Sequence, residues 1–363
     1  MATLFKQHYT RGEILRRVGD ISQVAGVQWH ELQDGTERGV RVLEVRTGSG
    51  LTFDVVPDRG MDISRAEFSG VPIAWRSSTG VVAPWFYDTS DYGLLRSFHG
   101  GLLLTCGLVS MGVPSEDQAR RYPMHGRASN VPAHQVRYGA DWDGDEYLIW
   151  VEGKVRETQL FGENMELTRR ITTSLGATEL VVHDVVRNIG FAPEPVMMLY
   201  HMNFGFPLLD EDTRIRFGKT DVVVPRDDEA RKGQSVHDLG ALPSAGFREQ
   251  VFLHDPEPDH RGYVTVLLSN QRFSGGQGLG VRLRYEKRMF PYLWQWRMLG
   301  EGTYVMGIEP ANSKVFGRAA ARNEGVLELL QPGEERAFVL TVEVLPTNES
   351  IDDAETVLSE AVR

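Results

Sequence analysis

The feature that most constrains the fold is a long series of short segments in which hydrophobic and polar residues alternate. Residues 40–45 and 51–56 show this period-two pattern and are separated by Gly48-Ser49-Gly50, which favours a β-hairpin. The pattern recurs in residues 147–155, 165–173, 179–186, 196–201, 263–268, 281–285, 304–308 and 338–344. Many short strands punctuated by Gly, Pro, Asn and Asp predict an all-β fold, a large antiparallel sandwich or barrel.

Helical patterns are expected mainly near the two ends of the chain. Residues 10–13 read Thr-Arg-Gly-Glu, which has the form of a capping box, and the following pattern predicts a short helix over about residues 10–19. Ser350 and the apolar residues after it predict a second helix over about residues 350–362. No stretch has the composition of an interdomain linker. Because all-β folds often run long as one unit, we expect residues 1–363 to form a single domain.

Charge and cysteine content disfavour several classes of protein. The chain has 39 Lys and Arg against 50 Asp and Glu, a formal net charge of −11 that disfavours nucleic acid or an anionic membrane as the main partner. Cys106 is the only cysteine, so neither an intrachain disulfide nor a cysteine-based zinc site can form. The N-terminal residues lack the apolar run of a signal peptide, and no window approaches the ~18 apolar residues of a spanning helix. We therefore expect a cytoplasmic protein.

A loop between strands carries the first candidate functional residues. Residues 123–132 read Pro-Met-His-Gly-Arg-Ala-Ser-Asn-Val-Pro and place His125, Arg127 and Asn130 within six positions. Two prolines and a glycine favour a shaped loop, and loops on a rigid scaffold are where polar groups converge on a ligand. The alternative is a plain turn with a solvated arginine and a hydrogen-bonded histidine, and this stretch alone does not separate the two.

A histidine and a carboxylate lie at the ends of apolar strands. His201 ends the run 195–201, and Glu309 follows the run 304–308 and precedes Pro310. Partial burial raises the pKa of a glutamate and lowers that of a histidine, which suits the two side chains to proton transfer near neutral pH. The alternative for each residue is structural, a satisfied core histidine and a turn glutamate bonded to nearby backbone.

Further candidates lie beside glycines, in a charged turn and among aromatic residues. His99 precedes two glycines, which let the backbone approach a ligand closely, although a structural hydrogen bond is the alternative. Arg59 and Asp62 form a charged turn after a strand, where an internal ion pair is the alternative. Trp294 and Trp296 share one face of a predicted strand, and either core packing or stacking on the apolar face of a sugar accounts for them.

In this order, the segments resemble the aldose 1-epimerase (galactose mutarotase-like) superfamily, and most closely its less characterised bacterial branch. The resemblance spans roughly residues 53–344, and its strength lies in the order of motifs that are individually weak. It rests on His99-Gly100-Gly101, on His125-Gly126-Arg127-Ala128-Ser129-Asn130-Val131-Pro132, on Leu199-Tyr200-His201-Met202-Asn203-Phe204, on Gly307-Ile308-Glu309-Pro310-Ala311-Asn312 and on Leu330-Gln331-Pro332-Gly333-Glu334. Two departures concern the substrate: Ala133-His134 stands where the family usually has a tryptophan, and residues 210–212 do not match the sugar-binding aspartate of the family.

The resemblance implies a large antiparallel β-supersandwich and an isomerase that interconverts sugar anomers by opening and closing the ring. Glu309 would be the general base, His201 would protonate the ring oxygen, and His125 would stabilise that oxygen as it gains charge. No cofactor or metal is implied, and the partner is a small sugar or sugar derivative. The expected substrate-binding residues are Arg127, Asn130, His99, Arg59, Asp62, Arg96, Trp296 and Arg297.

Several alternatives remain open from the sequence. The same acid–base pair could isomerise or epimerise a sugar at another carbon through an enediol, or the chain could be a sugar-binding protein without catalysis. Two histidines and one carboxylate could also hold a metal, although no local ligand spacing supports this. Four arginines could recognise an acidic group on the sugar, namely Arg59, Arg96, Arg127 and Arg297. Edge strands could pair two chains into a homodimer.

Overall fold

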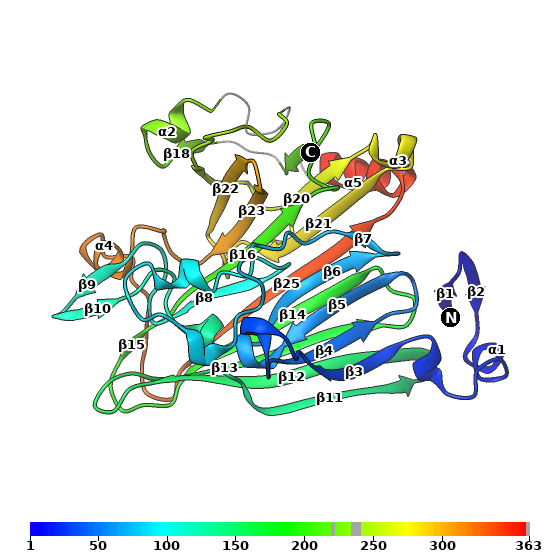
Figure 1. The fold of residues 1–363 in the computed structure, drawn as a ribbon, viewed down its shortest axis with the longest axis horizontal. Coiled ribbons are helices and arrows are strands. Elements are labelled where there is room, and N and C mark those ends of the chain that lie inside the picture. The colour runs from blue at the N-terminus through cyan, green and yellow to red at the C-terminus, as the bar shows by residue number, and fades with distance from the viewer. Residues whose placement is uncertain (219–221, 234–240, 361–363) are drawn as a thin grey trace.

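The computed structural model describes residues 1–218, 222–233 and 241–360, and these are mostly β-structure (Figure 1). Strands account for 47% of the residues and helices for 14%, which confirms the predicted all-β class. The strands form one sheet of eight strands, one of six and one of five, together with three two-stranded ribbons. All pairings between named strands are antiparallel, as the hairpin signals predicted. The strand bounds follow sheet by sheet.

The eight-stranded sheet forms the broad layer across the molecule (Figure 1). Its strands alternate between buried and exposed residues because one face packs on the core and the other meets solvent. In spatial order they are β11 (His134–Asp143), β12 (Glu146–Thr158), β13 (Asn164–Ser174), β14 (Glu179–Asn188), β25 (Glu335–Leu345), β21 (Leu279–Glu286), β20 (Tyr263–Asn270) and β17 (Arg214–Phe217).

The six-stranded sheet contains the predicted strands that end in His201 and Glu309. Its spatial order is β18 (Val223–Pro225), β19 (Gln250–His254), β22 (Tyr292–Gly300), β23 (Thr303–Ala311), β16 (Met197–Gly205) and β8 (Leu104–Leu108). The residues of β16 and β8 are buried throughout, and those of β23 nearly so. These three strands are covered on both faces, which explains their continuous apolar runs.

The five-stranded sheet packs with the eight-stranded sheet around one hydrophobic core. Its strands are β3 (Gly26–Glu31), β4 (Arg41–Arg46), β5 (Leu51–Val56), β6 (Asp62–Phe68) and β7 (Val71–Pro72). Phe53 and Ile63 from this sheet join Val151 and Leu340 from the eight-stranded sheet and Tyr200 from β16 in a single buried cluster. This shared core joins the five-stranded and eight-stranded sheets to β16 of the six-stranded sheet.

The helices are short, as expected, but not confined to the ends. Helix α1 covers Arg11–Leu15 and starts with the predicted capping box, yet it ends before residue 19 because Arg16 closes it. Helix α5 covers Asn348–Glu360, two residues earlier than predicted, and residues 361–362 lie outside the described part. Internal helices are α2 (Asp228–Arg231), α3 (Phe273–Gly276) and α4 (Arg318–Asn323). Within the described ranges, no helix combines the length and hydrophobicity needed to span a bilayer.

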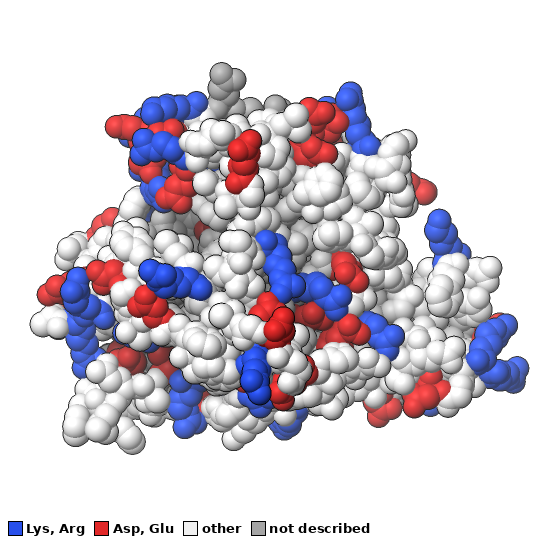
Figure 2. All heavy atoms as spheres, viewed as in Figure 1, with Lys and Arg blue, Asp and Glu red and all other residues white. Residues whose placement is uncertain are grey.

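The smaller ribbons lie at the periphery of the sheets. They pair β1 (Ala2–Leu4) with β2 (Gln7–Tyr9), β9 (Ser115–Asp117) with β10 (Arg120–Tyr122), and β15 (Glu194–Pro195) with β24 (Leu329–Leu330). On the face shown in Figure 2, the described Lys and Arg side chains are interspersed with Asp and Glu and do not gather into a continuous basic stripe.

Candidate functional site

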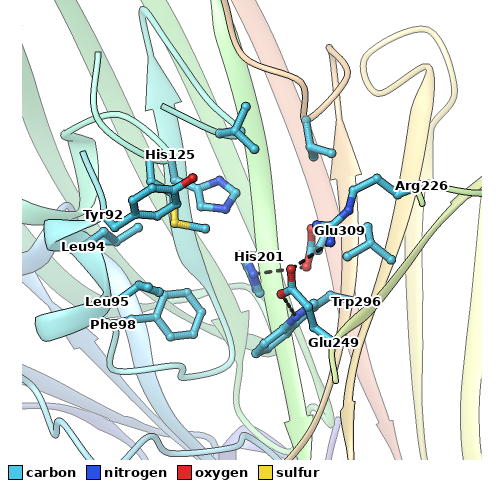
Figure 3. A pocket seen from close by; sticks show the side chains of 15 residues that line it. Tyr92, Leu94, Leu95, Phe98, His125, His201, Arg226, Glu249, Trp296 and Glu309 are labelled. Atoms are coloured by element: carbon cyan, nitrogen blue, oxygen red, sulfur yellow. Dashed lines mark hydrogen bonds and ion pairs between the residues drawn. The ribbon is translucent and has the colours of Figure 1, made fainter. Parts of the chain in front are cut away.

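A cavity of about 350 Å³ opens beside the six-stranded sheet and brings His125, His201 and Glu309 together (Figure 3). The volume is within the range of small-molecule sites. Its wall is formed by strands β16, β19, β22 and β23, by a 3-10 helix at Gly93–Arg96 and by the loops that carry Gly112 and His125. The fold therefore unites three residues that lie 76 and 108 positions apart in the sequence.

The strand register sets His201 and Glu309 side by side. Antiparallel pairing of β16 with β23 joins Leu199 to Ala311 and Met202 to Ile308, so His201 lies directly opposite Glu309. Opposed side chains on neighbouring strands are within contact distance. The Nε2 of His201 and the Oε1 of Glu309 are 3.1 Å apart, and both side chains are almost completely buried. This distance is short enough for direct proton transfer between them.

Gly307 leaves the space that this pair needs. A Cβ atom at this position would lie 2.5 Å from the Oε1 of Glu309 and 3.3 Å from the Cε1 of His201. Any side chain here would displace the carboxyl group from the histidine. The sequence analysis did not single out Gly307 as a functional residue, although a glycine inside a predicted strand is a known sign of close approach by another group.

Burial shifts the protonation of the pair in opposite directions. Burial raises the pKa of Glu309 to about 8, with a further contribution from the negative charge of Glu249 that Arg226 partly offsets. Burial also lowers the pKa of His201 well below its ordinary value, and the neighbouring His125 adds to this effect. In the free protein at neutral pH, the pair therefore holds one proton, mostly on the carboxyl group.

His125 enters the cavity from a strained loop. Its φ of +57° lies in the left-handed region, which is uncommon for a residue other than glycine and is concentrated at functional sites. Its backbone holds this position because N–H donates to the carbonyl of Gly112 and the carbonyl accepts from the N–H of Gly107. Burial lowers the pKa of His125 to about 4, so the ring is neutral at pH 7. The rings of His125 and His201 are 5.8 Å apart.

Three buried polar atoms at this site have no hydrogen-bond partner among the described residues. They are Nδ1 of His125, Nδ1 of His201 and, apart from its contact with His201, Oε1 of Glu309. Unpaired buried polar atoms cost stability and are rare in folded proteins. A cluster of three in one cavity wall is the arrangement expected where a polar ligand supplies the missing partners.

Two aromatic rings fix the orientation of His201. The rings of Phe98 and Trp296 meet the imidazole edge to face, with centroids 5.0 Å and 5.3 Å away. The indole N–H of Trp296 donates to Glu249 at 3.1 Å, and Arg226 donates to the other oxygen of Glu249 at 2.8 Å. Of these residues the sequence analysis proposed only Trp296. Phe98, Arg226 and Glu249 carried no motif, because only the pairing of distant strands brings them to the cavity.

Two expected binding residues serve the protein framework instead. Arg59 is fully buried and donates to the backbone carbonyls of Ser129, Val82 and Ser97 at 2.7–2.9 Å. Asp62 is also buried and accepts from the backbone and hydroxyl of Thr105. Neither lines the cavity. Their binding role, inferred from a charged turn, is therefore corrected: these charges point inward and bond to the backbone or to other buried groups.

Trp296 lines the cavity as expected, whereas the other expected binding residues also lie outside its wall. Asn130 is buried and accepts from the hydroxyl of Ser97 at 3.1 Å, and His99 is buried within the protein near Gly101. Arg96 is 80% exposed and pairs with Asp88 across 3.4 Å. Arg127 is half-buried. Arg297 is buried and lies over the ring of Phe252. The described arginine in the cavity wall is Arg226, which is not one of the four arginines proposed to recognise an acidic group.

The described residues contain no group of three or more His, Cys, Asp or Glu side chains arranged to hold a metal ion. The geometry at His125, His201 and Glu309 is instead that of a proton-transfer pair with a neighbouring imidazole. Such an arrangement can remove a proton from one oxygen of a ligand while delivering a proton to another.

The fold places this protein among the galactose mutarotase-like structures. A candidate aldose 1-epimerase from Klebsiella pneumoniae subsp. pneumoniae superposes with a TM-score of 0.86 at 26% identity, covering 93% of this chain and 88% of that one. A galactose mutarotase-like protein from Clostridium acetobutylicum has a TM-score of 0.59 at 14% identity, covering 89% and 99%. The galactose 1-epimerase of Lactobacillus acidophilus has a TM-score of 0.54 at 12% identity, covering 88% and 98%. The last two similarities concern the fold alone.

The family model described as a domain of unknown function (DUF4432) matches residues 37–344. The chain belongs to this family. No curated protein matches the chain. The expected resemblance to the aldose 1-epimerase (galactose mutarotase-like) superfamily is confirmed by the structural neighbours.

Proposed function

We propose that this protein is an aldose 1-epimerase that interconverts the anomers of a cyclic sugar. The single observation that carries the proposal is the buried contact of 3.1 Å between His201 and Glu309 in a cavity of sugar size. The names of the structural neighbours, a candidate aldose 1-epimerase and a galactose 1-epimerase, support the same reaction class. Neither the pair nor the neighbours identify the sugar.

The shared proton gives the pair both an acid and a base. When hydroxyl groups of the sugar enter the cavity, they solvate the carboxylate, and the proton moves from Glu309 to His201 across 3.1 Å. The ionised Glu309 takes the proton of the anomeric hydroxyl while His201 gives its proton to the ring oxygen. The C1–O5 bond breaks and C1 becomes an aldehyde, so the total number of protons is unchanged.

Ring closure reverses these transfers. After rotation about C1–C2, the C5 hydroxyl oxygen attacks the other face of the aldehyde and gives its proton to His201, while Glu309 protonates the aldehyde oxygen, which becomes the new anomeric hydroxyl. The neutral His125 donates a hydrogen bond to the oxygen that gains charge, since its ring lies 5.8 Å from that of His201. The aromatic rings of Phe98 and Trp296 keep the acid in place throughout.

Anomer exchange followed by NMR or polarimetry tests this proposal. A panel of neutral sugars, sugar phosphates and uronates should contain at least one aldose whose exchange the protein accelerates. Glu309→Gln should reduce that acceleration by about 10²–10⁴-fold, the usual contribution of a general base. Near-normal exchange in this variant would exclude Glu309 as the base. A product with a different constitution would instead indicate reaction at another carbon.

A further inference from the structure

The cavity has two unlike sides, separated by His201 (Figure 3). Arg226, Glu249 and Glu309 lie on one side. The other side is formed by Leu94, Leu95 and Phe98, together with Met124, which directly precedes His125 in the chain, and these four residues are called the apolar wall below. The ring of His125 and the side chain of Tyr92 border the apolar wall.

The apolar wall is partly open to solvent. Leu94 is buried, but Leu95 is 55% exposed at the cavity mouth. Phe98 presents its ring to His201 with centroids 5.0 Å apart, so the wall begins directly beside the proton-transfer pair. Exposed apolar surface inside a concave site becomes favourable when a ligand covers it with apolar groups. A hydroxyl placed there gains no hydrogen bond from these four side chains and leaves apolar surface uncovered.

The order of atoms in a pyranose determines which substituent meets the apolar wall. In the proposed function, on which this step rests, the anomeric hydroxyl faces Glu309 and the ring oxygen faces His201. The ring oxygen lies between C1 and C5. The substituent on C5 is therefore directed past His201 and away from Glu309. Leu95 and Phe98 lie on that side of the cavity. C2 is directed the opposite way, towards Glu249 and Arg226, which can bond hydroxyl groups.

We infer that the cavity selects 6-deoxyhexoses, sugars whose C5 substituent is a methyl group instead of a hydroxymethyl group. The methyl group covers Leu95 and Met124 and gives up no hydrogen bond. The corresponding hexose has to bury its 6-hydroxyl against the same side chains. Apolar pockets discriminate against an added hydroxyl by up to about 100-fold. We expect a preference of about 10- to 100-fold for the deoxy sugar of each matched pair that binds.

Binding measured on matched sugars tests the inference without relying on turnover. The pairs are 6-deoxy-D-glucose with D-glucose, 6-deoxy-D-galactose with D-galactose, and L-rhamnose with L-mannose. In saturation-transfer NMR on the wild-type protein, the methyl protons of a bound deoxy sugar should receive the largest saturation, and its Kd should be about 10- to 100-fold lower than that of its hexose. Equal or tighter binding of the hexoses, or binding of none of the six sugars, overturns the inference.

A variant of the apolar wall provides the second test. Leu95→Asn places a donor and an acceptor where the 6-hydroxyl would lie, and because Leu95 is 55% exposed the variant should fold as the wild type does. In this variant, the ratio of the hexose Kd to the Kd of the matched deoxy sugar should fall towards one. Leu160→Asn makes the same exchange at a site that is 82% exposed and outside the cavity wall, and it should leave the ratio unchanged. An unaltered ratio in Leu95→Asn overturns the inference.

Rates of anomer exchange separate this inference from the proposed function. A deoxy preference in binding, with loss of that preference in Leu95→Asn but no accelerated exchange of any sugar, supports the selectivity and excludes the epimerase. Equal acceleration of hexose and deoxy sugar supports the epimerase and overturns the selectivity.

Discussion

Neighbouring residues on strand β16 take part in two opposite kinds of buried polar cluster. The hydroxyl of Tyr200 donates to Asp184, which also accepts two hydrogen bonds from Arg169. Arg169 donates further to Thr105 at 2.8 Å and to Asp62 at 3.2 Å. This cluster is fully buried and Arg169 pairs with both carboxylates, although the Oδ2 of Asp62 has no hydrogen-bond partner among the described residues. On the other face of the strand, His201 and Glu309 lie in a cavity with polar atoms that lack partners.

This difference distinguishes a polar cluster that stabilises the fold from a polar pair that can exchange a proton with a ligand. Paired buried charges stabilise each other and hold the strands, and removing one member leaves the rest uncompensated. A carboxyl group without a paired cation instead keeps its proton, so it can exchange that proton with a ligand. The predictions below test whether the Tyr200 cluster determines stability and the His201 pair determines activity.

The largest expected effect is on stability, from Arg169→Met. Asp184 and Asp62 would remain buried without their cation, which should reduce the free energy of unfolding by about 3–5 kcal/mol. Urea denaturation measures the loss. Arg170→Met is the matched control, because Arg170 is the next residue, is partly exposed and pairs with Glu152 at the surface, so its loss should stay below about 1 kcal/mol. Equal effects of the two variants would contradict the contrast.

Glu309→Gln should stabilise the protein at alkaline pH while it slows turnover. The folded pKa of about 8 exceeds the unfolded value near 4.5, so wild-type stability falls as the pH rises from about 4.5 to 8 and then levels off with respect to this group. Glutamine has no proton to lose. The variant should therefore gain a few kcal/mol relative to wild type above pH 8 and almost nothing below pH 4.5. A difference that does not change with pH would argue against a raised pKa.

Gly307→Ala should damage activity more than stability. The new Cβ would lie 2.5 Å from the Oε1 of Glu309 and force the carboxyl group away from His201, so kcat should fall by about 10- to 100-fold. Gly12→Ala serves as the control, because a Cβ there meets nothing within 4 Å. Kinetics of anomer exchange, together with a thermal melt of both variants, measure the two effects. Unchanged kcat in Gly307→Ala would show that the close approach has no role in the reaction.

The smallest effect is the dependence of rate on pH. The reaction needs one proton on the pair, so the rate should be flat around neutrality and fall about tenfold per unit above pH 8, where Glu309 loses that proton. Because burial lowers the pKa of His201, the flat part of the pH–rate profile should extend to pH values below the ordinary pKa of histidine. A rate that begins to fall near pH 6.5 as the pH is lowered would instead indicate an unperturbed histidine.

The sequence predicted the strands and several residues of the candidate site because both leave local signals. Period-two runs gave the strands, and polar residues at the ends of apolar runs gave His201 and Glu309. The left-handed backbone at His125 fits the shaped loop that its prolines and glycine indicated. The resemblance to a known superfamily supplied the order of these segments, which composition alone could not.

The parts of the candidate site that the sequence did not predict depend on contacts between distant segments. Glu249 and Arg226 reach the cavity only because β19 pairs with β22, and neither residue belongs to a motif. Arg59 and Asp62 were placed at the site wrongly because a charged turn reads the same whether it faces a ligand or the interior. Their side chains are fully buried and bond to the backbone or to other buried groups, which the sequence does not indicate.

The contrast between the two faces of β16 is tested most directly by anomer exchange in Glu309→Gln and Tyr200→Phe, measured side by side at pH 7 with the fastest sugar of the panel. Exchange in Glu309→Gln should be about 10²–10⁴-fold slower than in wild type, whereas Tyr200→Phe should lose about 1–3 kcal/mol of stability and keep its rate within about threefold. An equal loss of rate in both variants, or a normal rate in Glu309→Gln, would contradict the assignment of chemistry to the open pair.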